Sequence, residues 1–128
     1  MDAHGGLLSD LPRPLPHINL KWGDEPTPKS FAGGDLRGIE EGLDYLQETG
    51  VTCIYMTPVF QSVSNHKYDI EDYYKVDPRF GGDEALRSLI AAAHKRGMKV
   101  VLDGVFNHCA HTNPIFVDTS IRGRESPY

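Results

Sequence analysis

Cysteine is scarce in this sequence, and its scarcity excludes a fold held together by disulfide bonds. Cys53 and Cys109 are the two cysteines among 128 residues, and their spacing forms neither a metal-binding nor a redox motif. Because free cysteine is commonly buried, we expect two buried or half-buried thiols. A chain of this kind favours a reducing compartment such as the cytoplasm.

Long apolar runs and an excess of positive charge are also absent. The apolar runs are far shorter than the roughly 20 residues that cross a bilayer, and the N-terminal MDAHGGLLSD lacks the basic and apolar blocks of a signal peptide. The chain has 13 basic and 18 acidic residues, a net charge of −5, without a long run of either sign. This balance argues against nucleic acid or a membrane as the main partner, and we expect a cytoplasmic protein.

Proline is concentrated at one end of the chain. Five of the nine prolines lie within residues 1–30, at positions 12, 14, 16, 26 and 28. They prevent a regular helix or a central strand there, so we expect residues 1–30 to form an irregular, Pro-rich segment. From Phe31 onward the apolar residues recur with regular periods.

A helix pattern followed by a strand pattern then occurs twice. Asp35 is suited to cap the first helix and Gly50 to end it. Its apolar stripe comprises Leu36, Ile39, Leu43 and Leu46. The run VTCIYMTPVF (51–60) is nearly all apolar and breaks at Pro58. This composition is typical of a strand that is buried on both faces of a parallel sheet.

The second unit follows the same pattern. We expect Asp83 to cap its helix and Gly97 to end it. The predicted buried stripe of this helix is Leu86, Leu89, Ile90 and Ala93. MKVVLDGVF (98–106) then predicts a second buried strand. Alternating helices and strands of these lengths indicate an α/β fold with parallel strands and right-handed crossovers.

The connection between the first strand and the second helix is unusually long. Residues 61–82 span 22 positions, whereas such connections usually take about 2 to 6 residues. The segment is rich in polar and aromatic side chains, namely His66, Tyr68, Asp69, Asp72, Tyr73, Tyr74 and Asp77. It leaves the carboxyl end of a parallel strand, where α/β proteins place their sites, so it predicts a binding surface.

The segment LDGVFNH (102–108) places a carboxylate at the end of an apolar strand. A buried carboxylate is costly unless it is paired or hydrogen-bonded, so Asp103 needs donors from neighbouring segments. Alternation puts Asp103 on one face with Val101 and Val105. Asn107 and His108 follow the strand and would reach over the same edge of the sheet.

These segments resemble the α-amylase family of glycoside hydrolases. LDGVFNH (102–108) is similar to the D-x-V-x-N-H signature at the end of the third barrel strand. NHKYDIEDYYKVDPRFG (65–81) resembles the segment that follows the second strand in that family. WGDEPTPKSFAGGDLRGI (22–39) is similar to the approach to the first helix in the neopullulanase, maltogenic amylase and cyclomaltodextrinase branch. All three occur in the family's order and spacing.

The resemblance implies part of a TIM (β/α)8 barrel. Residues 31–108 would supply helix 1, strand 2, helix 2 and strand 3, and residues 109–128 would begin the inserted loop domain after strand 3. A whole barrel takes about 250 residues. In this family the nucleophile, the acid/base and a third carboxylate follow strands 4, 5 and 7. The resemblance therefore implies a piece of a retaining hydrolase of maltodextrin, cyclodextrin, pullulan or starch, without its catalytic carboxylates and inactive alone.

The resemblance also assigns roles to individual residues. Tyr68 would stack on the glucose ring before the scissile bond, and His108 would hydrogen-bond the same ring. His66 and Asp69 flank Tyr68 and are predicted to contribute to substrate binding. Asp103 would be a supporting residue that is not itself catalytic. A stand-alone carbohydrate-binding or assembly module, without catalysis, is the alternative function.

Metal binding is left open by the sequence. Gly33, Asp35 and Asn107 match parts of calcium sites in the family, while no metal is expected to be required. The H-x-x-H pair His108 and His111, with Asp103, is typical of zinc, but solvated histidines are the simpler interpretation because no third ligand stands at metal spacing. We also expect self-association through open strand edges.

Overall fold

The computed structural model describes residues 20, 23–27 and 30–128. The expected irregular segment over residues 1–30 therefore lies mostly outside the described residues. The elements are α2 (Leu36–Glu41), α3 (Leu43–Glu48), β1 (Cys53–Met56), β2 (Phe60–Ser62), β3 (Ile70–Val76), η1 (Pro78–Phe80), α4 (Gly82–Lys95), β4 (Lys99–Leu102), α5 (Pro114–Arg122) and η2 (Gly123–Glu125). In the described part of the chain, no helix is both long and apolar enough to cross a membrane.

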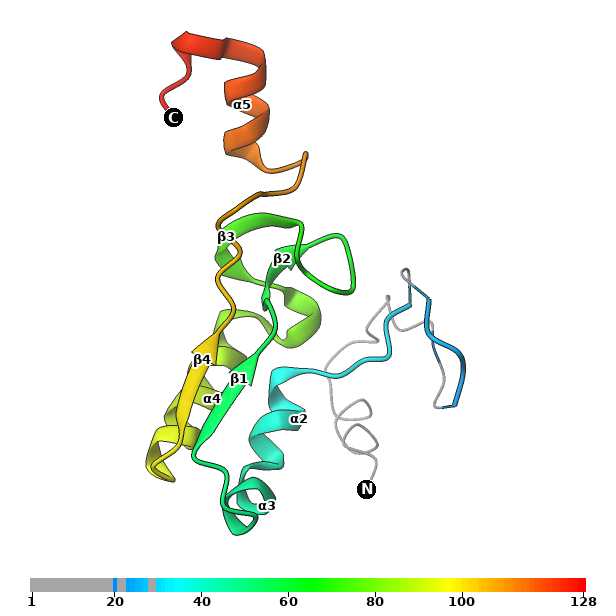
Figure 1. Ribbon diagram of the computed structural model, residues 1–128, viewed down its shortest axis with the longest axis vertical. Helices are drawn as coiled ribbons and strands as arrows, with labels where there is room; N and C mark the ends of the chain where they lie inside the picture. The colour runs from blue at the N-terminus through cyan, green and yellow to red at the C-terminus, as the bar shows by residue number, and fades with distance from the viewer. Residues whose placement is uncertain (1–19, 21–22, 28–29) are drawn as a thin grey trace.

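A parallel strand pair with helices on one face forms the body of the molecule. β1 pairs with β4 in register from Cys53↔Lys99 to Met56↔Leu102. The chain passes from β1 to β4 through α4, which lies behind the two strands, with α2 beside them (Figure 1). The predicted α/β organisation with parallel strands is confirmed.

The core lies between the two strands and the helices. Its buried members are Leu36, Leu43, Met56, Val59, Val76, Ala85, Leu89, Ala93 and Met98. Three of them, on α4, recur every fourth residue, which places them on one helical stripe. Of the predicted α4 stripe, Leu89 and Ala93 are fully buried and Leu86 and Ile90 are half-buried.

The prediction that both strands are buried on two faces is wrong for the described residues. Burial alternates along β1, and Tyr55 is 61% exposed. Val101 on β4 is also exposed. The reason is that the described helices cover one face of the pair and leave the other open. Cys53 lies on the open face and is exposed, contrary to expectation, whereas Cys109 is half-buried as expected, and both thiols are free.

The first predicted helix is divided in two. Asp35 caps α2 as predicted, accepting from the backbone N–H of Gly38 at 2.8 Å. The break lies at Gly42, which closes α2 and opens α3, because glycine is a poor helix former. Gly50 ends α3 with a φ of 86°, as expected for a helix C-terminus.

The predicted cap of the second helix is wrong. Gly81 is the residue that precedes α4, at a φ of 99°. A Cβ at this position would lie 2.6 Å from the Cβ of Ala85, so glycine is required. Asp83 lies inside the first turn, where its carboxylate accepts from the backbone N–H of Val76 at 2.9 Å. Tertiary contact with β3 therefore replaces the local capping that the sequence predicts.

Residues 61–82 contain regular secondary structure and are not a simple connecting loop. The predicted strand over 51–60 ends at Met56, and after Pro58 the chain enters β2, which pairs antiparallel with β3 through a bulged register. The hairpin lies beyond the carboxyl ends of β1 and β4 (Figure 1). The second predicted strand, 98–106, likewise stops at Leu102, before Gly104, which disfavours regular strand pairing.

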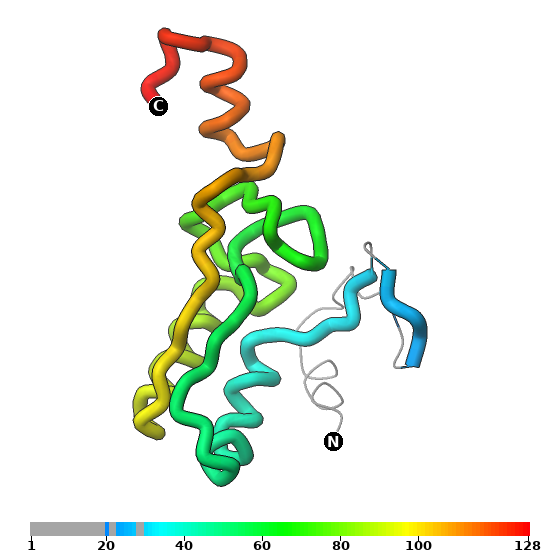
Figure 2. Tube along the Cα trace, in the orientation of Figure 1, coloured from blue at the N-terminus to red at the C-terminus, as the bar shows by residue number. Residues whose placement is uncertain are grey.

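The C-terminal residues extend away from this body. Asn113 caps α5 by accepting from the backbone N–H groups of Ile115 and Phe116. The trace in Figure 2 leads from β4 past the hairpin to α5, which lies at the opposite end of the molecule from α3. The assignment of residues 109–128 to the beginning of a separate domain stays a prediction.

Candidate functional site

Asp103 is held by two tyrosine hydroxyls. It follows β4 directly, and its backbone N–H donates to the carbonyl of Met56 at 3.1 Å. Its Oδ2 accepts from the hydroxyl of Tyr55 at 2.9 Å and from that of Tyr68 at 2.8 Å. Tyr55 comes from β1 and Tyr68 from the segment before β3. These donors stabilise the half-buried carboxylate that the sequence leaves unexplained.

The carboxylate keeps both phenols protonated. The pKa of Tyr55 and that of Tyr68 are raised, mainly because each hydroxyl donates to Asp103, with smaller effects from partial burial and from the negative charge. A raised phenol pKa means that both hydroxyls remain hydrogen-bond donors throughout the neutral range. Asp103 therefore acts as an acceptor that orients two rings.

His108 is held beside Tyr68 by one contact of its ring and one contact of its backbone carbonyl. Its Nε2 lies 2.9 Å from the carbonyl oxygen of Tyr68, and because a carbonyl only accepts, this nitrogen carries the proton. The hydroxyl of Tyr73 lies 2.7 Å from the carbonyl of Val105 and 2.8 Å from that of His108. Burial raises the pKa of Tyr73, with a smaller effect from Cys109, so this hydroxyl stays a donor.

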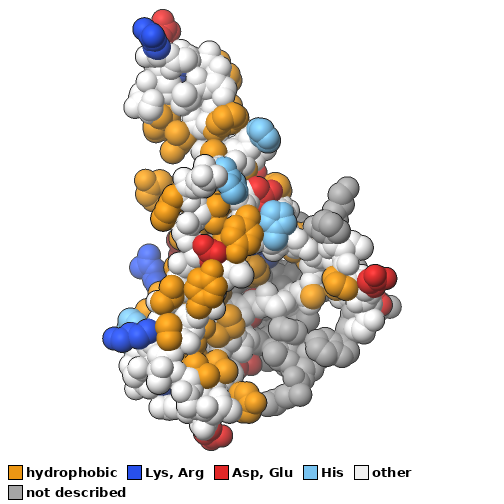
Figure 3. All heavy atoms as spheres, viewed as in Figure 1, with side chains coloured by type: hydrophobic (Ala, Val, Ile, Leu, Met, Phe, Trp, Pro, Cys, Tyr) orange, Lys and Arg blue, Asp and Glu red, His pale blue; other side chains and the backbone are white. Residues whose placement is uncertain are grey.

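His66 lies against Tyr68 on the other side. The two rings are stacked with centroids 6.1 Å apart, and the backbone N–H of Tyr68 donates to His66 Nδ1 at 3.1 Å. We call Tyr55, His66, Tyr68, Asp103 and His108 the Tyr–Asp–His cluster. In the upper part of the face seen in Figure 3, histidine side chains lie near one another with acidic and hydrophobic side chains beside them, and hydrophobic side chains continue over the lower part.

The cluster suits a polyhydroxylated ring better than a metal ion. It combines a carboxylate acceptor with the side chain of Tyr68, which is 38% exposed, and these are elements that bind a sugar's hydroxyls and its flat apolar face. Among the described residues, no group of three His, Cys, Asp or Glu side chains could hold a metal. His111, the other half of the H-x-x-H pair, lies edge-on against Phe116.

Comparison with known proteins gives the family. The family described as "Alpha amylase, catalytic domain" matches residues 10–128. The chain belongs to the α-amylase family. This confirms the resemblance seen in the three sequence segments and the assignment of the α/β elements to part of a TIM barrel.

Two curated relatives show how much of such a protein the α-amylase-family chain covers. A cyclomaltodextrinase of Bacillus sp is 47% identical over 127 residues, which are 98% of this chain and 22% of the relative. The intracellular maltogenic amylase of Bacillus subtilis strain 168 is 46% identical over 114 residues, 88% of this chain and 19% of the relative. The chain thus spans about a fifth of the length of these relatives.

Solved structures agree with the assigned fold. The cyclic α-maltosyl-(1→6)-maltose hydrolase of Arthrobacter globiformis superposes with a TM-score of 0.80 at 40% identity, over 88% of this chain and 26% of that one. The debranching enzyme of Nostoc punctiforme gives a TM-score of 0.69 at 51% identity, over 85% of this chain and 23% of that one. Relatives of both kinds match the branch that the sequence resembles.

The structure brings together four of the predicted site residues of the α-amylase-family chain. Asp103, Tyr68, His108 and His66 meet in the cluster, although their roles toward a substrate stay predictions. Asp69 instead accepts from the hydroxyls of two serines in its own loop. Burial alone would raise the pKa of Asp69, but these hydrogen bonds outweigh it and lower the pKa.

The predicted calcium ligands show no completed site. Asp35 is buried and one of its oxygens caps α2, and the exposed Asn107 contacts its neighbour His108. Gly33 and Asp35 belong to one predicted site and Asn107 to another, and neither set reaches the about six to eight oxygen ligands that calcium takes. The assignment of calcium to these three residues stays a prediction.

Sequence reasoning missed Tyr55 and the contact between Lys67 and Asp77. Tyr55 lies in a nearly apolar run. Side chains alternate along a strand, so Tyr55 shares one face of β1 with Cys53, and this alternation is the signal that could have placed it beside Asp103. Lys67 and Asp77 form a buried ion pair of 2.7 Å beneath the turn that carries Tyr68. No local pattern predicts this pair, because its two members are ten positions apart and meet through the β2–β3 hairpin.

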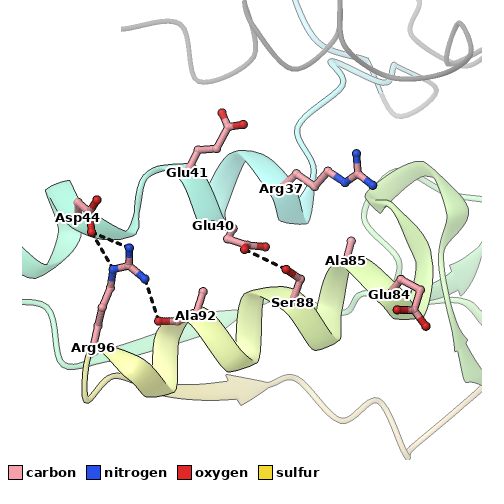
Figure 4. Close-up of a pocket in the computed structure, with 9 residues that line it drawn as sticks. All are labelled: Arg37, Glu40, Glu41, Asp44, Glu84, Ala85, Ser88, Ala92 and Arg96. Atoms are coloured by element: carbon pink, nitrogen blue, oxygen red, sulfur yellow. Dashed lines mark hydrogen bonds and ion pairs between the residues drawn. The ribbon is translucent and has the colours of Figure 1, made fainter.

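Two grooves lie beside the helices, one away from the cluster and one that extends to it. Figure 4 shows a groove of about 620 Å³ between α2, α3 and α4, where Arg96 contacts Asp44 and Glu40 accepts from Ser88. It is a mixed-charge surface groove between helices. A second, largely apolar groove of about 530 Å³ runs between α2, α3 and β1 and reaches Tyr55.

Proposed function

We propose that the chain forms part of the glucan-binding wall of a retaining α-glucan hydrolase, with Tyr68 as the sugar platform. The observation that carries this proposal is the convergence of the Tyr55 and Tyr68 hydroxyls on Asp103, with His108 alongside. The carboxylate of Asp103 offers an acceptor to sugar hydroxyls, and the tyrosine ring offers an apolar face. Asp103 acts by orienting the rings.

Relatives support an α-glucan as the ligand. They include a cyclomaltodextrinase and a maltogenic amylase, and the Arthrobacter globiformis hydrolase has been solved in complex with maltose. A cytoplasmic location is part of the proposal, because one relative is named an intracellular enzyme.

We further propose that the chain binds a glucan without cleaving it. Retaining glycosidases use two carboxylates about 5 to 5.5 Å apart, one as nucleophile and one as acid/base. The family resemblance assigns both to strands beyond β4. Asp103 accepts hydrogen bonds from two phenols that stay protonated, which suits a supporting role. Purified chain is therefore expected to release no reducing sugar from β-cyclodextrin, pullulan or starch.

Replacement of Tyr68 by alanine should weaken binding of β-cyclodextrin by about tenfold, which corresponds to about 1.4 kcal/mol. The loss follows from removal of the aromatic platform, and isothermal titration calorimetry measures it. Tyr74→Ala is the matched control, because Tyr74 is 90% exposed and lies outside the cluster. Added EDTA should leave the affinity unchanged, since no metal is proposed to be required.

Three results would contradict this function. Wild-type chain that does not bind β-cyclodextrin or maltoheptaose would exclude the glucan platform. Equal losses for Tyr68→Ala and Tyr74→Ala would place the sugar elsewhere. Loss of binding in EDTA, restored by calcium, would assign an essential metal.

We propose that the chain self-associates through the open edges of the strand pair formed by β1 and β4. Within the described residues, β1 and β4 pair only with each other. A pair with two free edges exposes unpaired backbone groups that can join a second copy. Sedimentation velocity under reducing conditions should show dimers that dissociate on dilution. A monomer that unfolds cooperatively at every concentration would exclude this proposal.

A proline on β1 tests which edge is used. The carbonyl of Thr52 accepts a hydrogen bond from Lys99 of β4, and that of Met56 accepts one from Asp103, which follows β4. Because successive residues of a strand face opposite edges, Cys53 directs its backbone N–H to the open edge. Cys53→Pro should abolish the dimer, whereas Cys53→Ser, which keeps the N–H and also removes the thiol, should leave it intact.

A further inference from the structure

Lys67 is a buried lysine in the turn that carries two exposed aromatic residues. Its side chain is 1% exposed, while His66 before it and Tyr68 after it are exposed. The Nζ atom donates to Asp77 Oδ2 at 2.7 Å and to the carbonyl of Ser62 at 3.2 Å. A lysine is almost never so buried unless it is paired, which indicates a specific role for this side chain.

Two aromatic rings enclose the ammonium group. Lys67 Nζ lies 5.4 Å from the ring centroid of Phe31 and 5.4 Å from that of Phe80, within the range of cation–π attraction. Burial lowers the pKa of Lys67, and the hydrogen bond and charge of Asp77 oppose that change. The ammonium group of Lys67 therefore contacts a carboxylate, a carbonyl oxygen and two aromatic rings.

The backbone of Lys67 adopts a conformation that lysine disfavours. Its φ is 65°, and it is the one non-glycine residue with positive φ among the described residues. Glycine would adopt this left-handed conformation at less cost. The turn reverses the chain so that residue 67 points inward while residues 66 and 68 point outward. The side-chain contacts of Lys67 must hold this turn.

Asp77 connects the turn to the rest of the hairpin. One oxygen accepts from the backbone N–H of Arg79 at 2.8 Å, where Asp77 caps η1. The other accepts from Lys67 and, at 3.3 Å, from the guanidinium of Arg79. The Lys67 side chain thus fastens the turn to the end of β2 and to the start of η1.

We propose that Lys67 is the positioning residue of the Tyr–Asp–His cluster: its clamped ammonium holds the left-handed turn that directs His66 and Tyr68 outward and brings the Tyr68 hydroxyl to Asp103. Lys67 does not touch the sugar. The inference rests on the proposed function only in naming a glucan as the ligand that this arrangement receives.

Two variants separate the side-chain clamp from the backbone conformation. Lys67→Met keeps an unbranched stem between the two rings, and Asp77 keeps Arg79 as a partner, so the fold should persist. Lys67→Gly removes the clamp but suits the left-handed turn. Lys75→Met is the matched control, because Lys75 is an exposed lysine on β3.

Titration of the tyrosines provides a readout that does not depend on a ligand. With ¹³Cζ-labelled tyrosine and Tyr68→Phe for assignment, NMR reports the pKa of each phenol. In wild-type chain the Tyr68 pKa is raised by its hydrogen bond to Asp103. In both Lys67 variants the pKa of Tyr68 should fall, because its hydroxyl loses the hydrogen bond to Asp103, while the pKa of Tyr55 stays raised. Lys75→Met should change neither.

Affinity for β-cyclodextrin is the second readout. Both Lys67 variants should bind about tenfold more weakly than wild-type and Lys75→Met chains, which corresponds to about 1.4 kcal/mol. An unchanged Tyr68 titration in both variants would overturn the proposal, as would failure of both variants to fold, which would make Lys67 a stability residue only. If wild-type chain binds no glucan but the Tyr68 titration still shifts, the glucan function fails and the positioning role stands.

Discussion

Replacement of Asp77 by alanine should lower the free energy of unfolding by about 3 to 5 kcal/mol, the usual cost of leaving a buried charge unpaired. Lys67 would keep its ammonium at 1% exposure without its carboxylate. The backbone N–H of Arg79 would lose its acceptor at the start of η1 as well. Urea unfolding followed by circular dichroism measures the change.

A surface ion pair provides the control for Asp77. Asp44 contacts Arg96 at 2.7 Å but is 75% exposed, and such pairs contribute about 0 to 1 kcal/mol. Asp44→Ala should therefore change stability little. The double variant Lys67→Met/Asp77→Ala should recover part of the loss, because it removes both charges. Equal effects of Asp77→Ala and Asp44→Ala would show that burial does not govern the Asp77 pair.

Leu89→Ala is expected to destabilise the chain by about 2 to 5 kcal/mol through lost burial and an unfilled cavity. Leu89 is fully buried on α4, between Ala85 and Ala93, and faces the strand pair across the core. Its small neighbours on the same stripe cannot fill the space that the substitution leaves. The same urea unfolding series measures the change.

Ile121→Ala is the matched deletion for Leu89. Ile121 lies on α5 and is 79% exposed, so the variant should stay within about 0.5 kcal/mol of wild type. A comparable loss at Ile121 would mean that α5 is covered in solution by a surface that contributes to stability. A small loss at Leu89 would mean that α4 does not form the core seen in the structure.

Features set by a few neighbouring residues were predicted well. Asp35 caps α2 by accepting from the backbone N–H of Gly38, three residues further along the chain. Gly50 and Gly97 end their helices at positive φ. These assignments succeed because the interactions close within one helical turn. The strand pattern drew attention to Asp103 and His108, and the long connection drew attention to Tyr68, but the roles predicted for these residues came from the family resemblance.

Features that depend on distant partners were not predictable. Asp83 resembles a helix cap, but it accepts from Val76 once β3 packs against α4. The strand β3 was missed because its polar and aromatic sequence becomes a strand only when β2 supplies its pairing edge. The apolar run around Tyr55 predicted full burial, whereas the described helices cover just one face of β1.

The α/β alternation, the ends of the helices and the family could all be predicted from the amino-acid sequence. Those features follow from local periodicity, from glycine and capping chemistry, and from motifs in order. Tertiary structure alone decided how Asp103 is stabilised and which way Tyr68 points. Tyr55, Tyr68 and Asp103 come from three separate segments, and the Lys67–Asp77 pair closes beneath one of them. Contacts between segments that are far apart in the sequence produce no periodic pattern of residues. They are therefore seen only in the folded structure.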